Sequence, residues 1–268
     1  MVSSEERAET LAEYFETVQW AVRPTTPNQY TDRLGPDLQL NSGPISESEV
    51  VAAGKLLNKK RASGSDGIPP EFWKAITVAG SGACQWAINL CQKCWNEGAV
   101  PKAWHEALVV KVFKKGDTSQ CENYRPISLL QIGYKLFALI LLTRLKAAGA
   151  EDRIWRTQFG FRSQYGTRDA LFLARRMIER AWDEKHGKLV FLALDWAKAF
   201  DTISPDALTA ALERFGVTPP LLKVIRSIYS DRCFQVRDAG CTSTAHPQTF
   251  GSCQFVKDVL CHLFCSQW

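Results

Sequence analysis

Two carboxylates suited to chemistry, Asp195 and Asp201, follow the apolar run LVFLAL of residues 189–194. Burying an ionised acid without a partner is costly. A hydrophobic strand that ends on an aspartate therefore usually presents it to a cation or to hydrogen-bond donors. From this stretch alone two interpretations stay open. The acid can cap a helix or a surface turn, which is the commoner use, or it can bind a metal ion.

Three other segments place cations where a polyanion could bind. Lys114 and Lys115 follow the apolar stretch ALVVKVF, and Arg125 lies in YRPI. Arginine can bind two phosphate oxygens with its planar guanidinium, whereas lysine acts as a point charge. The loop TQFGFR holds Phe161 beside Arg162, a pair that suits stacking on a single strand plus a phosphate contact. The two lysines can also simply solvate a hairpin tip, which is our interpretation of Lys115.

The elements that would position these residues form no regular βαβ series, which predicts an α+β fold. Ser46, with Glu49 three residues later, predicts a helix start by a capping box, and Gly216 predicts a helix end. The stretch 189–194 is too apolar to alternate, so we expect a strand buried on both faces. A further strand is expected at 107–113, and further helices at about 5–20, 73–95, 134–148 and from 167 onward.

Composition sets broad limits. The chain has 268 residues, a net charge of +5 and 46% hydrophobic residues, enough to bury a sizeable core. The basic excess permits a polyanionic partner without requiring one. The longest apolar candidate, KLFALILLTRLK, is interrupted by an arginine and is too short for a membrane span. The first fifteen residues are acidic and amphipathic, unlike a signal peptide, so no membrane partner is expected.

Cysteine usage indicates the compartment. Nine cysteines without a secretory signal favour free thiols in a reducing intracellular compartment, the nucleus or the cytoplasm. Cys84, Cys91 and Cys94 have a zinc-like spacing, but they would share one helix face, so core packing is the expected role. A second zinc-like group, near the C-terminus, consists of Cys253, Cys261, His262 and Cys265.

The most specific signal is a set of four motifs in order, namely SGSDGIPPEFWKA (63–75), NYRPISLLQIGYKLFALILLTRL (123–145), TQFGFRSQYGTRDAL (157–171) and LALDWAKAFDTI (192–203). Together they strongly resemble the reverse transcriptase domain of non-LTR (LINE-type) retrotransposons. The resemblance covers about residues 5 to 251. It implies an RNA-directed DNA polymerase with a right-hand fold of mixed helices and a small antiparallel sheet.

The resemblance also implies a division of the chain. Residues 1–45 would form an N-terminal helical extension or linker, residues 46–188 a fingers-like region, and residues 189–250 the first part of the palm. The reaction of an intact relative would be two-metal phosphoryl transfer from a dNTP to a primer 3′-hydroxyl on an RNA template. RNA template, DNA primer and dNTPs are thus the expected partners, with no stable protein partner.

Roles at the reacting centre follow from the same resemblance. Asp195 would coordinate Mg²⁺ (or Mn²⁺), two ions in an intact relative, and the backbone carbonyl of Trp196 would be a further ligand. Phe200 would lie under the sugar and reject a 2′-hydroxyl, although its spacing alone fits core packing equally well. Asp201 would lie near the site, where a structural hydrogen bond is our first expectation.

Binding roles are implied for the basic segments. Lys114 and Arg125 would grip the triphosphate of the dNTP, and Gln158, Phe161 and Arg162 would contact the template. The loop KKRASGSDG has Ser63 and Ser65 where the family usually has prolines, which predicts a more flexible loop.

The C-terminal sequence departs from the family pattern. The family continues with a Gln-Gly-Cys-Pro-Leu-Ser-Pro motif and a strand pair with two adjacent aspartates, but no two acids are adjacent after Asp201. From the third base of the Gln254 codon, a shifted frame with freely chosen synonymous codons can encode ICQGCPLSPFLFSM, which contains the missing motif. We therefore expect residues 251–268 to be an out-of-frame tail, and its zinc-like group to be accidental.

The sequence thus predicts a truncated LINE-type reverse transcriptase that is inactive by itself. The alternative is a non-catalytic nucleic-acid-binding remnant of such an element. A third interpretation, a degenerate product that never folds, predicts no soluble protein on expression.

Overall fold

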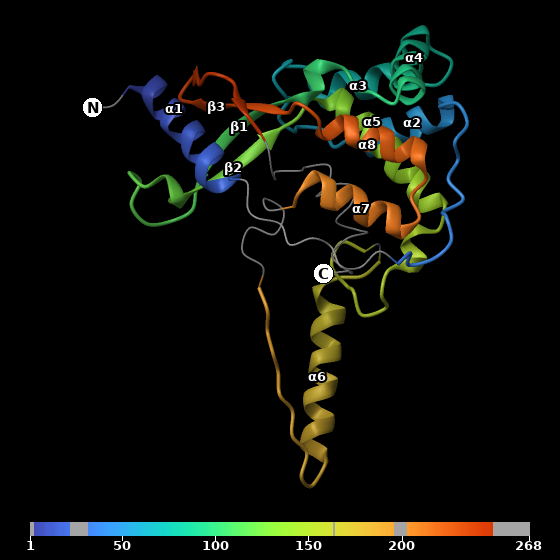
Figure 1. Ribbon diagram of the computed structural model, residues 1–268, viewed down its shortest axis with the longest axis vertical. Coiled ribbons are helices and arrows are strands. Elements are labelled where there is room, and N and C mark those ends of the chain that lie inside the picture. Colours follow the sequence, from blue (N-terminus) through green and yellow to red (C-terminus); the bar gives the residue numbers. More distant parts are fainter. Residues whose placement is uncertain (1–2, 22–31, 163, 196–202, 249–268) are drawn as a thin grey trace.

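The computed structural model describes residues 3–21, 32–162, 164–195 and 203–248 (Figure 1). The strands are β1 (Glu106–Phe113), β2 (Tyr124–Leu129), β3 (Cys233–Asp238), β4 (Cys241–Thr242) and β5 (His246–Pro247). The α-helices are α1 (Ser4–Tyr14), α2 (Glu47–Leu56), α3 (Pro70–Ile76), α4 (Gly82–Glu97), α5 (Ile132–Ala147), α6 (Thr167–Asp183), α7 (Pro205–Phe215) and α8 (Pro219–Tyr229). A π-helical turn, η1 (Phe15–Gln19), extends α1, and 3₁₀ turns lie at η2 (Lys102–His105), η3 (Cys121–Asn123) and η4 (Ala150–Arg153).

The strands form one mixed sheet in the order β2-β1-β3-β4, with β5 also paired to β3. β1 pairs antiparallel with β2 and parallel with β3. Mixed helices and a small sheet agree with the expected α+β class, but the expectation of an antiparallel sheet is wrong. A parallel pair needs a long crossover, and the chain makes one here through the helices between β2 and β3.

Helix α1 and its π-helical extension pack on one face of this sheet, beside β3 (Figure 1). The helix begins with a capping box between Ser3 and Glu6. The ring of Trp20 lies edge-on to Phe234 of β3, with 4.6 Å between the ring centroids. The expected helix at about 5–20 is confirmed, and its buried stripe belongs to the main core. This stripe consists of Leu11, Ala12, Phe15 and Trp20.

Polar contacts hold the same helix to the last strands. His246 of β5 lies between two carboxylates, with Nδ1 2.6 Å from Glu16 Oε2 and Nε2 2.9 Å from Glu9 Oε1. Glu9 also accepts hydrogen bonds from the backbone N–H and the hydroxyl of Thr244. Burial alone would lower the pKa of His246, but the hydrogen bonds to Glu16 and Glu9 outweigh it and raise the pKa above 6.5.

This histidine predicts a pH dependence of stability. A group whose pKa is raised by folding stabilises the protein fully below its unfolded pKa, and this contribution is lost as the pH rises through the folded pKa. We therefore expect the urea midpoint to fall as the pH rises above about 6.5, the ordinary pKa of histidine. The His246→Gln variant should lose most of this slope, as measured by tryptophan fluorescence at several pH values.

The matched control is His186→Gln, because His186 is exposed in the turn after α6. Burial lowers the pKa of His105 below its ordinary value, whereas the pKa of His246 is raised. His105 therefore changes the stability only in more acidic solutions, where its protonation destabilises the fold. An unchanged slope in His246→Gln, or the same loss in His186→Gln, would contradict the assignment.

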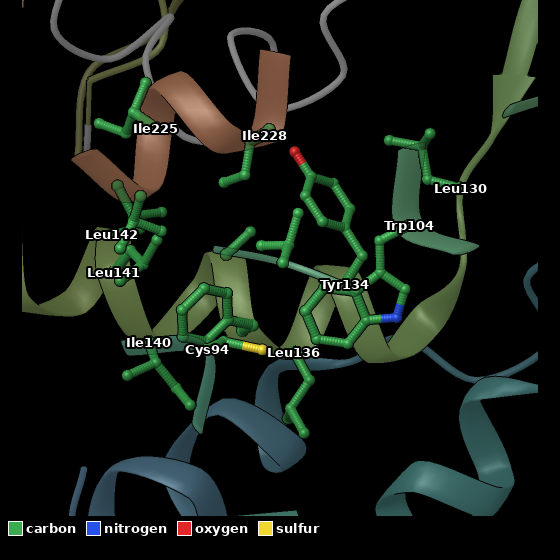
Figure 2. Packing of buried hydrophobic residues seen from close by; sticks show 14 of the residues in the cluster. Cys94, Trp104, Leu130, Tyr134, Leu136, Ile140, Leu141, Leu142, Ile225 and Ile228 are labelled. Carbon is green, nitrogen blue, oxygen red and sulfur yellow. The ribbon is translucent and has the colours of Figure 1, made fainter. Parts of the chain in front are cut away.

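The centre of the core is α5, which is apolar on nearly all sides and buried along most of its length. Figure 2 shows side chains of α5, from Tyr134 to Leu142, beside the ring of Trp104 and the α8 residues Ile225 and Ile228. This is the helix predicted at 134–148, and it contains the longest apolar stretch of the chain. Among the described helices, none is long and apolar enough to cross a membrane.

The cysteines of α4 also belong to this core. Cys84, Cys91 and Cys94 are all buried, so core packing, the expected role, is confirmed. Burial raises the pKa of Cys91 to about 12 and that of Cys94 to about 11. Both thiols therefore stay protonated at neutral pH and act as small apolar side chains.

Helix α6 and the segment after it project away from the other elements (Figure 1). No residue of α6 is buried, and Trp182 is 83% exposed. The strand predicted at 189–194 is wrong, because these residues have no paired strand and are exposed, with Val190 at 92%. An apolar segment becomes a buried strand only when a partner strand and a covering layer are present, and the described residues supply neither.

Candidate functional site

The β1–β2 hairpin carries the two residues expected to bind a triphosphate. The backbone N–H of Lys114 donates to the carbonyl of Asn123 at 2.8 Å, which extends the ladder one step past Phe113 and Tyr124. The Lys114 ammonium donates to the Glu122 carbonyl at 3.0 Å, on the same turn. Arg125 is exposed on β2, opposite Val112 of β1.

The turn of this hairpin is ordered by its own hydrogen bonds. Asp117 accepts from the backbone N–H of Ser119 at 2.8 Å, and the Asn123 amide donates to the Asp117 carbonyl at 2.8 Å. The Tyr124 hydroxyl donates to the Thr118 carbonyl at 2.9 Å. Lys114 and Arg125 are therefore brought together at the end of one defined hairpin.

One face of the sheet places Arg125 beside a residue that sequence reasoning missed. In the observed register Val110 of β1 lies between Ile127 of β2 and Arg237 of β3. Side chains of paired residues share a face, and so do side chains two positions apart along a strand. Arg125 and Arg237 therefore flank an exposed apolar strip on one face. Arg237 could have been found only by predicting β3, for which the alternation of Phe234 and Val236 with Gln235 and Arg237 was the available signal.

The expected template-contacting residues lie in the loop between η4 and α6. The Arg162 guanidinium lies 4.4 Å from the ring centroid of Tyr165 and donates to the Trp155 carbonyl at 3.3 Å. Gln158 donates to the Gly160 carbonyl at 3.3 Å. Phe161 has a φ of 58° and is 48% exposed. A left-handed phenylalanine with an exposed ring is unfavourable by itself, so the loop holds it there.

Asp195 lies on a separate segment, at the exposed end of the extended residues 187–195. The other residues expected around the reacting centre, Trp196, Phe200 and Asp201, lie outside the described residues. Within the described ranges no three histidine, cysteine or acidic side chains come together as metal ligands. One carboxylate does not fit a two-ion site by itself, so the described residues do not account for the metal centre that the resemblance implies.

Comparisons with known proteins decide the family. The family model described as "Reverse transcriptase (RNA-dependent DNA polymerase)" matches residues 112–253, more than half of the chain. The chain belongs to the reverse transcriptase family. The match includes the last two residues of β1, the turn with Lys114, strand β2, the loop between η4 and α6, and the segment that ends on Asp195.

Individual relatives refine this assignment. The chain is 30% identical over 243 residues to "Probable RNA-directed DNA polymerase from transposon BS" of Drosophila melanogaster, which covers 88% of this chain and 26% of that protein. It is 30% identical over 216 residues to "RNA-directed DNA polymerase from mobile element jockey" of the same organism, covering 78% of this chain and 23% of that protein. It is also 30% identical over 195 residues to "Retrovirus-related Pol polyprotein from type-1 retrotransposable element R2" of Popillia japonica, covering 72% of this chain and 26% of that protein.

These relatives are polymerases of LINE-type, non-LTR retrotransposons, so the resemblance in the four motifs is confirmed. The chain spans about a quarter of the length of these relatives. Reverse transcriptases generally use divalent metal ions and bind an RNA template with a primer.

Proposed function

We propose that this chain is the fingers and the first part of the palm of a LINE-type RNA-directed DNA polymerase. The intact polymerase would add dNTPs to a primer 3′-hydroxyl opposite an RNA template. The observation that carries the proposal is the family match over residues 112–253, which includes the hairpin of Lys114 and Arg125. On this division residues 46–188 are fingers-like, residues 189–250 begin the palm, and residues 1–45 are an extension.

Each side chain would have a defined task. Arg125 is exposed and rigidly placed on β2, so its planar guanidinium would bind phosphate oxygens of the dNTP. The Lys114 ammonium, which donates to Glu122, would exchange that carbonyl for a phosphate oxygen. Gln158, Phe161 and Arg162 would contact the template, with the exposed ring of Phe161 available for stacking on a base.

The reacting centre would lie at the end of the segment that carries Asp195. We propose Asp195 and the Trp196 carbonyl as metal ligands, Phe200 as the residue that excludes ribonucleotides, and Asp201 as a structural hydrogen-bonding acid. A bound Mg²⁺ or Mn²⁺ would supply charge neutralisation at the transferred phosphate. The remaining carboxylates of an intact relative would have to come from residues other than those described.

A second candidate is a non-catalytic nucleic-acid-binding remnant. It is favoured by the combination of the exposed Arg125 and Arg237 on the sheet and the partly exposed Arg162 in the loop before α6 with an exposed carboxylate at Asp195 that joins no metal-ligand cluster among the described residues. This candidate predicts RNA binding without polymerisation in any form of the chain.

Primer extension separates the two candidates. The 268-residue chain would be compared with a chain continued in frame from Gly251 through the Gln-Gly-Cys-Pro motif, the aspartate pair and the thumb. We expect no incorporation of dNTPs by the first on an RNA template with Mg²⁺, and clear incorporation by the second. Robust incorporation by the 268-residue chain would refute its proposed inactivity. A continued chain that binds RNA but incorporates nothing would support the remnant.

A further inference from the structure

The part of the chain that projects from the fold carries a large exposed apolar surface. It consists of α6 and the extended segment that follows it, residues 167–194, and we call it the α6 arm (Figure 1). None of its residues belongs to the hydrophobic core. Eleven of its large apolar side chains, six on the helix and five in residues 189–194, are between 40% and 92% exposed. Among the described residues, nothing covers them.

The area of this surface is large for a monomer. A fully exposed large apolar side chain presents roughly 100–200 Å², so the α6 arm exposes on the order of 1,000 Å² of apolar area. The largest apolar patch of a typical monomer is about 300–600 Å². A standard protein interface buries about 800 Å² of each partner. The α6 arm by itself therefore offers enough apolar area for one complete interface.

The apolar residues of α6 follow the pattern of a helix that packs against another helix. Leu171, Ala174, Ile178 and Ala181 recur at spacings of three, four and three residues, which places them in one stripe along the helix. The alanines alternate with the larger residues, so the stripe has hollows as well as projections. A second stripe of the same kind can interdigitate with it.

The charges of α6 favour a protein partner over a lipid surface. Its arginines make ion pairs within the arm, Arg175 and Arg176 with Glu179 at 2.8 and 2.6 Å, and Arg180 with Glu184 at 3.7 Å. A helix that binds an anionic membrane instead carries an excess of lysine and arginine on its polar face. The polar face of α6 therefore lacks the uncompensated charge that would attract anionic lipid.

The extended segment also lacks a partner for its backbone. Residues 189–194 are exposed and pair with none of the described strands. All six side chains are apolar. An unpaired segment of this composition is a template for strand pairing with another chain. The same segment of a second copy matches it in length and composition.

We propose that the α6 arm binds the α6 arm of a second copy of this chain. A two-fold axis would relate the copies, so that each buries the same surface. The helical stripe and the unpaired segment would then both be covered by their counterparts, and no other protein is required. This inference goes beyond the proposed function and holds for the polymerase and for the remnant alike, because it uses no residue proposed to bind nucleotide, metal or template.

Sedimentation velocity of the 268-residue chain between about 1 and 50 μM tests the proposal. Interfaces of this area give micromolar or tighter dissociation constants, so we expect a dimer at the upper concentration. Leu171→Lys with Ile178→Glu puts two opposite charges into the stripe without changing the net charge. Burial of these charges should weaken the dimer by at least about tenfold. The fold of the monomer should be unchanged, because the two side chains are 64% and 40% exposed in it.

The matched control is Leu34→Lys with Val78→Glu. These side chains are 49% and 55% exposed and lie outside the α6 arm, so the control makes the same kinds of replacement elsewhere on the surface. It should leave the dissociation constant of the dimer within about twofold. Equal weakening of the dimer by the two double variants would contradict the assignment of the interface to the α6 arm.

Hydrogen exchange provides an independent measurement on the backbone. The amides of residues 189–194 should exchange fast in dilute wild-type protein and slowly at the concentration where the dimer forms. In Leu171→Lys with Ile178→Glu they should stay fast at both concentrations. Slow exchange at both concentrations in a monomeric wild-type chain would mean that residues 249–268 of the same chain cover the α6 arm, which would overturn the proposal.

Other occupants of the surface give different results. A wild-type chain that stays monomeric at about 50 μM has no interface of the expected strength. Assemblies that grow beyond a dimer with concentration indicate nonspecific association of apolar surface rather than a two-fold interface. A monomer that binds vesicles of phosphatidylcholine and phosphatidylserine through the α6 arm indicates a membrane surface. Each of these three results would overturn the proposal.

Discussion

Arg144→Met is expected to lower the free energy of unfolding by about 3–5 kcal/mol, as expected for breaking a buried ion pair from one side. Arg144 lies on α5 with its side chain only 3% exposed, and its partner is Glu49 of α2. Replacement by methionine leaves similar apolar bulk but removes every hydrogen bond of the guanidinium.

The reason for the large effect is the number of groups that depend on this side chain. Nε and Nη2 of Arg144 donate to the two carboxylate oxygens of Glu49. The remaining donors bind the carbonyls of Asn41, Gly43 and Pro44 at 3.0, 3.0 and 2.9 Å. Methionine would leave a partly buried carboxylate and three carbonyls without these donors.

The pKa of Glu49 supports this interpretation. Burial alone would raise the pKa of Glu49, but hydrogen bonds from Arg144 and Ser46 hold it below its ordinary value of 4.5. A depressed pKa contributes stability that is present above the unfolded pKa and lost as the pH falls through the folded pKa. The difference between wild type and Arg144→Met should therefore shrink in acid, below about pH 4.

Urea unfolding followed by tryptophan fluorescence measures the effect. Arg175→Met is the control, because Arg175 makes an ion pair with Glu179 but is 79% exposed, and such pairs contribute about 0–1 kcal/mol. A double variant, Arg144→Met with Glu49→Gln, should be less destabilised than the sum of the single variants, because the orphaned charge is gone. A loss below about 1 kcal/mol in Arg144→Met would show that the pair is not needed to hold α2 on α5.

Local signals in the sequence predicted most of the helices. The Ser46–Glu49 capping box is present at the start of α2, and Gly216 ends α7 in the left-handed conformation with φ of 95°. The apolar character of 134–148 identified the buried α5. These features depend on a few neighbouring residues, which is why sequence reasoning finds them.

The pairing of strands into a sheet could not be predicted from the sequence. β3 contains Gln235, Arg237 and Asp238, and it becomes a strand because β1 and α1 lie beside it, far away in the sequence. Conversely, the segment at 189–194 has the composition of a strand but no partner among the described residues. Strand formation depends on such distant partners more than on composition.

The candidate site also has a part that could be predicted from the sequence and a part that could not. The hairpin with Lys114 and Arg125 could be anticipated, since both residues lie within one local unit of sequence. The loop that carries Arg61 meets the start of α5, which carries Lys135, through the close approach of Gly64 to Gln131, and only the folded chain shows that these segments touch. The sequence did contain a signal, the run Lys59-Lys60-Arg61 before a glycine- and serine-rich loop, but not its neighbour on α5.

Asp195→Asn is expected to abolish reverse transcription in the chain continued in frame through the aspartate pair, by at least about 1000-fold. Asparagine keeps the shape of the side chain but removes the negative charge that a metal ligand needs. RNA affinity should stay within about twofold, because one exposed carboxylate adds no phosphate contact. Primer extension and RNA anisotropy on the same preparations separate these two effects.

Two further variants of the continued chain make the test specific to this carboxylate. Asp206→Asn removes a nearby acid that lies exposed in the first turn of α7, and it should leave extension unchanged. Phe200→Ala should preserve extension with dNTPs and admit ribonucleotides, because the bulk proposed to exclude a 2′-hydroxyl is gone. If Asp195→Asn extends primers as well as wild type does, the metal-ligand role belongs to another acid, and Asp201→Asn becomes the deciding variant. Loss of activity in Asp206→Asn as well would mean that removal of negative charge, rather than a defined ligand, impairs the polymerase.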